Sequence, residues 1–123
     1  LGADGMDELS TTGVNKVSRL DEDGLVSTFF LDPTDMGLRR ARLADVAGGM
    51  PDVNAHLTRD VLAGEKGPPR DIVVLNAAAT LVVGRVARSL REGIARAEAS
   101  IDSGSAASKL EELVEFTNRV RNG

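Results

Sequence analysis

Two adjacent carboxylates near the beginning of the chain, Asp7 and Glu8, have the types and spacing that point most directly to chemistry. They lie between Gly5 and Gly13, in a short stretch that also carries hydroxyl side chains. Mg²⁺ takes one or two protein carboxylates and completes its shell with water and phosphate oxygens. The pair therefore predicts metal–phosphate chemistry. Because the chain contains 19 Asp plus Glu, an ordinary solvated loop is the alternative interpretation.

Two further polar residues lie in regions that we expect to be helical. His56 is the only histidine, so a histidine-based metal cluster has no second imidazole, and we expect His56 on a helix surface or half-buried. Asn76 lies inside an apolar stretch, where an amide must find partners or cost about 1–3 kcal/mol. We expect Asn76 to tie its helix to a neighbouring loop, with direct ligand contact as the alternative.

Small and hydroxyl residues offer a second possible route to phosphate binding. Gly48 and Gly49 resemble a phosphate cradle, but no clear strand precedes them and no phosphate-loop Lys, Ser or Thr follows, so we expect a turn. Ser10, Thr11 and Thr12 beside the acids can donate to a phosphate or cap the backbone, and capping is the commoner use.

Composition limits the class of protein and its partners. A length of 123 residues with 41% hydrophobic and 28% charged residues is that of one globular domain. There are three Phe, no Trp and no Tyr, and the net charge is -4, which argues against nucleic acid. The absence of cysteine excludes disulfides and thiolate sites. The longest apolar stretch, residues 72–83, is too short to span a bilayer, so we expect no membrane and a cytoplasmic location.

The first third of the chain predicts a β-hairpin. Residues 14–20 and 25–31 are rich in β-formers and are separated by a turn that ends in Asp23-Gly24. Phe29 and Phe30 point to opposite faces of the second strand, which predicts that at least one strand is covered on both faces.

Short structured pieces and a first helix follow the hairpin. Residues 32–35 predict a single turn, interrupted by Gly37, and a short helix is expected over 43–46. A helix is expected over 51–63, ended by Gly64.

Three longer helices complete the predicted architecture. One runs from the prolines at 68–69 to about Val83, and its nearly all-round apolar surface predicts a helix surrounded by protein. The next begins at Ser89, where Glu92 completes a capping box. The last runs from the break at 103–105 to about Val120. Its expected inner face is formed by Leu110, Leu113, Val114 and Thr117.

Several segments together resemble the C-terminal part of anthranilate phosphoribosyltransferase. They occur in the order of that family and cover nearly the whole chain: residues 4–13, 31–38, 54–55, 61–64, 67–71, 75–78 and 101–104. The chain differs from the family pattern at Val14, where proline is usual, and at Met50, where an acidic helix cap is usual.

The resemblance implies the fold class and the organisation of the domain. The chain is expected to be α/β, a part of the nucleoside phosphorylase/phosphoribosyltransferase-type catalytic domain, with a β-hairpin followed by about four packed helices. Residues 1–123 form a single C-terminal portion in this interpretation, and the N-terminal helical domain is absent. A homodimer is expected of the complete protein, with its contacts in that absent domain.

The resemblance also implies a reaction and a cofactor. The family transfers a phosphoribosyl group from phosphoribosyl pyrophosphate (PRPP) to anthranilate in tryptophan biosynthesis, and Asp7 and Glu8 match its acidic pair that holds Mg²⁺ against the pyrophosphate. No residue of this chain is assigned as a proton donor, a nucleophile or a further cofactor ligand. The family's phosphate loop and anthranilate-binding stretches lie upstream, so the 123 residues alone are expected to be inactive.

Two alternatives to this interpretation remain open. One is a non-catalytic helical interaction module that has kept the fold and lost the reaction. The other is a related nucleoside phosphorylase, which the context of Asp7 and Glu8 matches less well.

Overall fold

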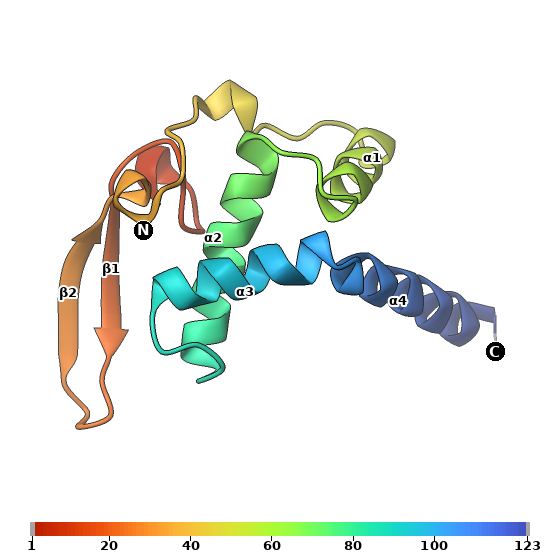
Figure 1. Cartoon of the computed structure of the whole chain (residues 1–123). Helices are drawn as coiled ribbons and strands as arrows, with labels where there is room; N and C mark the ends of the chain where they lie inside the picture. The colour runs from red at the N-terminus through yellow and green to blue at the C-terminus, as the bar shows by residue number, and fades with distance from the viewer. Residues whose placement is uncertain (1, 123) are drawn as a thin grey trace.

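The computed structural model describes residues 2–122, which form a hairpin and four α-helices with short 3₁₀ turns between them. Figure 1 shows the hairpin on one side of helix α2, α3 crossing α2, and α4 extending away on the opposite side. The predicted α/β chain of one hairpin and four helices is confirmed. No helix among the described residues is long and apolar enough to cross a membrane.

The hairpin consists of β1 (Asn15–Leu20) and β2 (Val26–Leu31), which pair antiparallel with Asn15 opposite Leu31. Gly24 in the turn has φ 81°, the left-handed conformation that glycine adopts at no steric cost. The prediction that one strand is covered on both faces is wrong for this chain. In β2 the exposed residues alternate with half-buried ones, and Phe30 is 73% exposed, because no element of the described chain covers that face.

The 3₁₀ turns are η1 (Ala3–Gly5), η2 (Pro33–Met36) and η3 (Leu43–Asp45). The second and third confirm the predicted turn and short helix. Gly37 ends η2 with φ 87°.

The helices are α1 (Pro51–Leu62), α2 (Pro68–Val83), α3 (Leu90–Asp102) and α4 (Ser105–Asn122), close to the predicted bounds. At the start of α3 the hydroxyl of Ser89 accepts from the N–H of Glu92 at 3.2 Å. The expected capping box is only half formed, because the Glu92 carboxylate accepts from the N–H of Arg88 at 2.9 Å instead of that of Ser89. This bond also holds the pKa of Glu92 below its usual value.

The core lies where α2 crosses α3 and the base of the hairpin joins them. Gly93 of α3 is buried against Ala78 of α2, so closely that a Cβ at Gly93 would lie 2.8 Å from the Ala78 carbonyl oxygen. The buried apolar cluster comprises Leu31, Leu38, Val74, Leu75, Ala78, Ile94, Ala97 and Ile101. This crossing fixes α2, whose middle turn also reaches the N-terminal loop.

Two predictions about helix surroundings are wrong for the described chain. Helix α2 is buried on one side only, and Val73 and Val83 on its other side are 42% and 84% exposed. On α4, Leu113 is 55% exposed and Thr117 is also exposed, although both were expected on an inner face. The physical reason is the same in both cases, because no described element packs on these surfaces.

Candidate functional site

The acidic pair lies on a tightly closed N-terminal loop. The N–H of Gly2 donates to the carbonyl of Met6 at 2.9 Å, which folds residues 2–6 back on themselves. A Cβ at buried Gly2 would lie 2.1 Å from the Glu8 carbonyl oxygen, so only glycine lets the chain pass so closely. Asp4 adopts a left-handed conformation with φ 56°, which is uncommon outside glycine. The loop thus has a defined shape immediately before the pair.

Both carboxylates of the pair are exposed and available for a ligand. Asp7 and Glu8 are exposed, and within residues 2–122 neither has a hydrogen-bond or ion-pair partner. The described residues contain no group of three or more acidic, His or Cys side chains that would form a closed metal site. Two free carboxylates fit Mg²⁺, because this ion commonly takes most of its ligands from water and phosphate.

Asn76, in the middle of α2, clamps the chain directly after the pair. Its Oδ1 accepts from the N–H of Leu9 at 3.0 Å, and its Nδ2 donates to the Leu9 carbonyl at 2.7 Å. Nδ2 also donates to the Ile72 carbonyl at 2.9 Å. The prediction that Asn76 ties its helix to a loop is confirmed, and the loop is the one that carries Asp7 and Glu8.

A second asparagine clamps the next residue, and sequence reasoning missed it. Asn15, at the start of β1, is fully buried; its Oδ1 accepts from the N–H of Ser10 at 2.7 Å, and its Nδ2 donates to the Ser10 carbonyl at 2.9 Å. The main chains of Leu9 and Ser10 are therefore both held by asparagine side chains. The signal in the sequence is an amide near the beginning of the strand predicted over residues 14–20.

Of the hydroxyl residues that follow Leu9, Ser10 caps the backbone, which is the commoner use expected of these side chains. The Ser10 hydroxyl accepts from the N–H of Thr12 at 3.0 Å and lies 2.8 Å from the Thr12 hydroxyl. Thr11 is buried, and its hydroxyl has no partner among the described residues.

The other sequence candidates lie apart from the acidic pair. His56 is exposed on α1. Gly48 and Gly49 lie in an irregular loop before α1 rather than in a regular turn, and the side chain of Asn54 accepts from the Gly49 N–H at 2.7 Å and donates to its carbonyl at 3.0 Å. Neither feature contributes to a site with Asp7 and Glu8.

An ion pair between buried Arg70 and exposed Asp102, also missed from the sequence, joins the start of α2 to the end of α3. Arg70 is 2% exposed, and its Nη1 lies 2.8 Å from Oδ1 of Asp102. Lys66 approaches the other oxygen of Asp102 at 3.6 Å. The Arg70 hydrogen bond, with the nearby positive charges, holds the pKa of Asp102 below its usual value. The pair braces the helix that carries Asn76.

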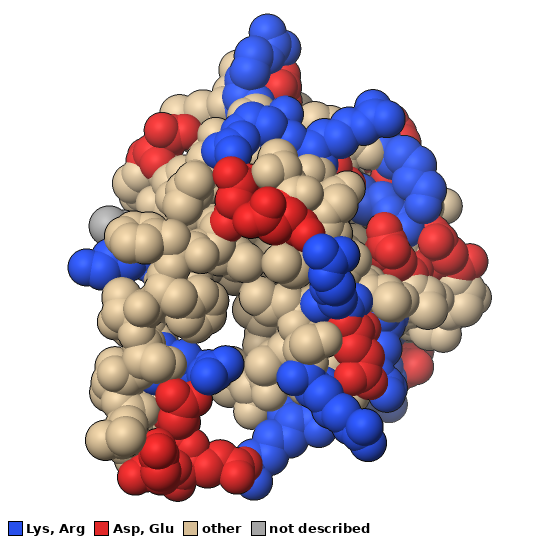
Figure 2. Space-filling view, turned by 60° about the vertical axis from the view of Figure 1, so that its left-hand side comes forward, with Lys and Arg blue, Asp and Glu red and all other residues tan. Residues whose placement is uncertain are grey.

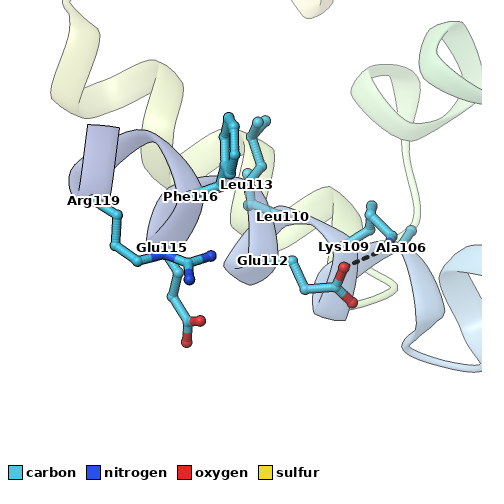
Figure 3. A pocket seen from close by; sticks show the side chains of 8 residues that line it. All are labelled: Ala106, Lys109, Leu110, Glu112, Leu113, Glu115, Phe116 and Arg119. Atoms are coloured by element: carbon cyan, nitrogen blue, oxygen red, sulfur yellow. Dashed lines mark hydrogen bonds and ion pairs between the residues drawn. The ribbon is translucent and has the colours of Figure 1, made fainter. Parts of the chain in front are cut away.

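A groove of about 550 Å³ lies along α4, away from the acidic pair. Figure 3 shows Leu113 and Phe116 on one side of α4 and Glu115 with Arg119 on another, while Lys109 pairs with Glu112. All of its lining residues belong to this one helix, so it is an uncovered helix surface rather than an enclosed site. The acidic pair, which offers free ligand atoms, remains the candidate site.

The surface charges are mixed. Figure 2 shows Lys and Arg beside Asp and Glu over the face in view, without a continuous basic stripe. Several of these charges are paired across short distances, including Arg40 with Asp32 at 2.6 Å and Arg96 with Glu92 at 2.8 Å.

Comparison with known proteins identifies the family to which this chain belongs. A sequence model of the glycosyl transferase family, a/b domain, matches residues 1–107. The chain therefore belongs to this family of glycosyl transferases. Within it, the chain is 52% identical over 119 residues to anthranilate phosphoribosyltransferase of Methylocella silvestris, covering 97% of this chain and 34% of that protein. The resemblance noted from the sequence motifs is thereby confirmed.

Solved structures agree with this assignment. Anthranilate phosphoribosyltransferase from Thermus thermophilus superposes with a TM-score of 0.83 at 39% identity, over 92% of this chain and 33% of that one. The Saccharomyces cerevisiae enzyme in complex with PRPP and Mg gives a TM-score of 0.77 at 30% identity, over 93% of this chain and 32% of that one. The chain spans about a third of the length of these relatives.

Proposed function

We propose that this chain is the C-terminal portion of an enzyme that transfers the phosphoribosyl group of PRPP to anthranilate in tryptophan biosynthesis. The observation that carries the proposal is the acidic pair itself. Asp7 and Glu8 are exposed and unpaired within the described chain, and they lie on a loop clamped by Asn76, in a chain similar to anthranilate phosphoribosyltransferases over nearly its whole length. The cytoplasmic location and the homodimer stay predictions.

The chemistry of the donor set supports Mg²⁺ as the cofactor. Asp7 and Glu8 would hold the ion through carboxylate oxygens, and they act neither as acids nor as nucleophiles. Bound Mg²⁺ supplies positive charge that stabilises the departing pyrophosphate. The role of the chain's own residues is to keep two negative ligands in place before the substrate arrives. Among the solved relatives, one is in complex with PRPP and Mg.

The 123 residues are proposed to be inactive by themselves. They contain no glycine-rich phosphate loop of the family type, and they span about a third of the relatives. Formation of phosphoribosyl anthranilate by the purified 123-residue chain, above that of its Glu8→Ala variant, would contradict this part of the proposal.

The decisive experiment compares carboxylate variants in the complete protein that contains these residues. Glu8→Gln is expected to lower kcat/KM by about 100-fold or more, because a ligand of the charge-stabilising metal is lost. Glu22→Gln is the matched control, since Glu22 is an exposed carboxylate on the hairpin turn that pairs with Arg85. Equal activity of the two variants would overturn the assigned role. An absence of Glu8-dependent binding of Mg²⁺ with pyrophosphate would favour the non-catalytic interaction module.

A further inference from the structure

We propose that Asn76 is a positioning residue for the acidic pair, holding the main chain so that Asp7 and Glu8 offer their carboxylates to Mg²⁺ and pyrophosphate from one backbone conformation. The inference rests on the function proposed above. Its basis is the two-bond contact between the Asn76 amide and the main chain of Leu9, which lies immediately after Glu8.

All hydrogen-bonding groups of the Asn76 amide are occupied, two bonds going to Leu9 and one to Ile72. Its two N–H groups donate to the carbonyls of Leu9 and Ile72, at 2.7 and 2.9 Å, and its oxygen accepts from the Leu9 N–H. An asparagine offers only two N–H donors, so its orientation is set by these partners. Helix α2, which carries Asn76, is anchored in the core through buried Val74, Leu75 and Ala78. Asn76 therefore connects a rigid helix to a surface loop.

Glu8 is restrained on both sides while its carboxylate stays free. On one side, the Glu8 carbonyl packs against Gly2, where any side chain would collide with it. On the other side, Leu9 is held by Asn76 through its main chain and packs its side chain against the core. Ligands ordered before binding lose less conformational freedom when the ligand arrives. A freely moving loop would bind the metal more weakly with the same two carboxylates.

The chain contains a matched control for this contact. Asn54 makes the same pair of hydrogen bonds with the main chain of Gly49, at 2.7 and 3.0 Å, in a loop that carries none of the candidate metal ligands. Replacing Asn54 removes an equivalent clamp without touching the acidic pair. A difference between the two sites then reports position rather than the general loss of a hydrogen-bonded amide.

The test measures binding of Mg²⁺ with inorganic pyrophosphate to the complete protein by calorimetry. In Asn76→Ser the short hydroxyl can still bond to Ile72 within the helix but does not span to Leu9. We expect its dissociation constant to rise about 10- to 100-fold, the usual effect of losing a support behind a metal ligand. Asn54→Ser is expected to stay within about twofold of the wild type. In turnover, Asn76→Ser should need more Mg²⁺ for half-maximal rate while keeping kcat at saturating Mg²⁺, a split that a general loss of stability would not produce.

The outcomes separate this inference from the proposed function. If Glu8→Ala abolishes binding and folded Asn76→Ser binds like the wild type, the positioning role is overturned while the function stands. If Glu8→Ala binds normally, the metal role of the pair fails, and the positioning role fails with it. If Asn76→Ser does not fold, the test is hydrogen exchange of the Leu9 amide in the unmodified protein. The Leu9 amide must then be protected before any ligand is added, and a freely exchanging Leu9 amide would overturn the inference.

Discussion

Replacing Gly93 by alanine is expected to destabilise the protein, although it makes α3 a better helix. Glycine in a helix interior costs about 1 kcal/mol relative to alanine, so propensity alone predicts a gain. The structure predicts the opposite sign, because Gly93 lies against Ala78 where α2 and α3 cross.

The magnitude follows from the distances at this crossing. An alanine Cβ at position 93 would lie 2.8 Å from the Ala78 carbonyl oxygen and 2.9 Å from its Cα, both backbone atoms that cannot rotate away. Restoring ordinary contact of about 3.4 Å requires the helices to separate by about 0.6 Å. Overfilling a packed core costs about 1–3 kcal/mol, and with backbone on both sides we expect about 2–3 kcal/mol. After the gain in propensity of about 1 kcal/mol, the net loss is about 1–2 kcal/mol.

Urea denaturation followed by circular dichroism measures the free energy of unfolding of Gly93→Ala. The control is Ala95→Gly, at an exposed position of the same helix, where propensity alone acts and a loss of about 1 kcal/mol is expected. Both substitutions should destabilise, although they change propensity in opposite directions. An increase in stability of Gly93→Ala by about 1 kcal/mol would refute the close crossing of α2 and α3.

Two further predictions concern the ends of the helices. Ser89→Ala removes the hydroxyl that accepts from the Glu92 N–H, and it should lower the free energy of unfolding by about 0.5–2 kcal/mol in denaturant titrations. Ser89→Gly should lower it by only a few tenths of a kcal/mol. Equal losses in the two variants would argue against the cap. The hydrogen bond from Arg70 lowers the pKa of Asp102 in the folded protein, so the ion pair stabilises the fold above the unfolded pKa of about 3.9. This stability is lost as the pH falls through the lower folded pKa. Asp102→Asn should therefore reduce the slope of the free energy of unfolding against pH on the acid side. A slope unchanged in that variant would show that the ion pair does not drive the acid response.

Local features of the fold follow from short stretches of sequence. The Asp23-Gly24 turn between two β-rich runs predicts the hairpin, since glycine accepts the positive φ that the turn needs. The prolines and the cap at Ser89 place the helix starts within a residue or two of the observed bounds, because each acts on its own backbone neighbours. The apolar patterns of α2 and β2 predict more burial than the structure shows, since Phe30, Val73 and Val83 are exposed. An apolar surface in a sequence does not identify the segment that covers it.

The sequence by itself determined the local elements, the acidic pair Asp7-Glu8, and the requirement that the amide of Asn76, inside an apolar stretch, find a partner. These depend on residue type and on neighbours a few positions away. Only the tertiary structure decided that this partner is Leu9, 67 residues distant along the chain, and that Asn15 holds the next residue. The same is true of the contact between Gly93 and Ala78. Such pairings are set by how helices and loops pack in three dimensions, which local pattern does not specify.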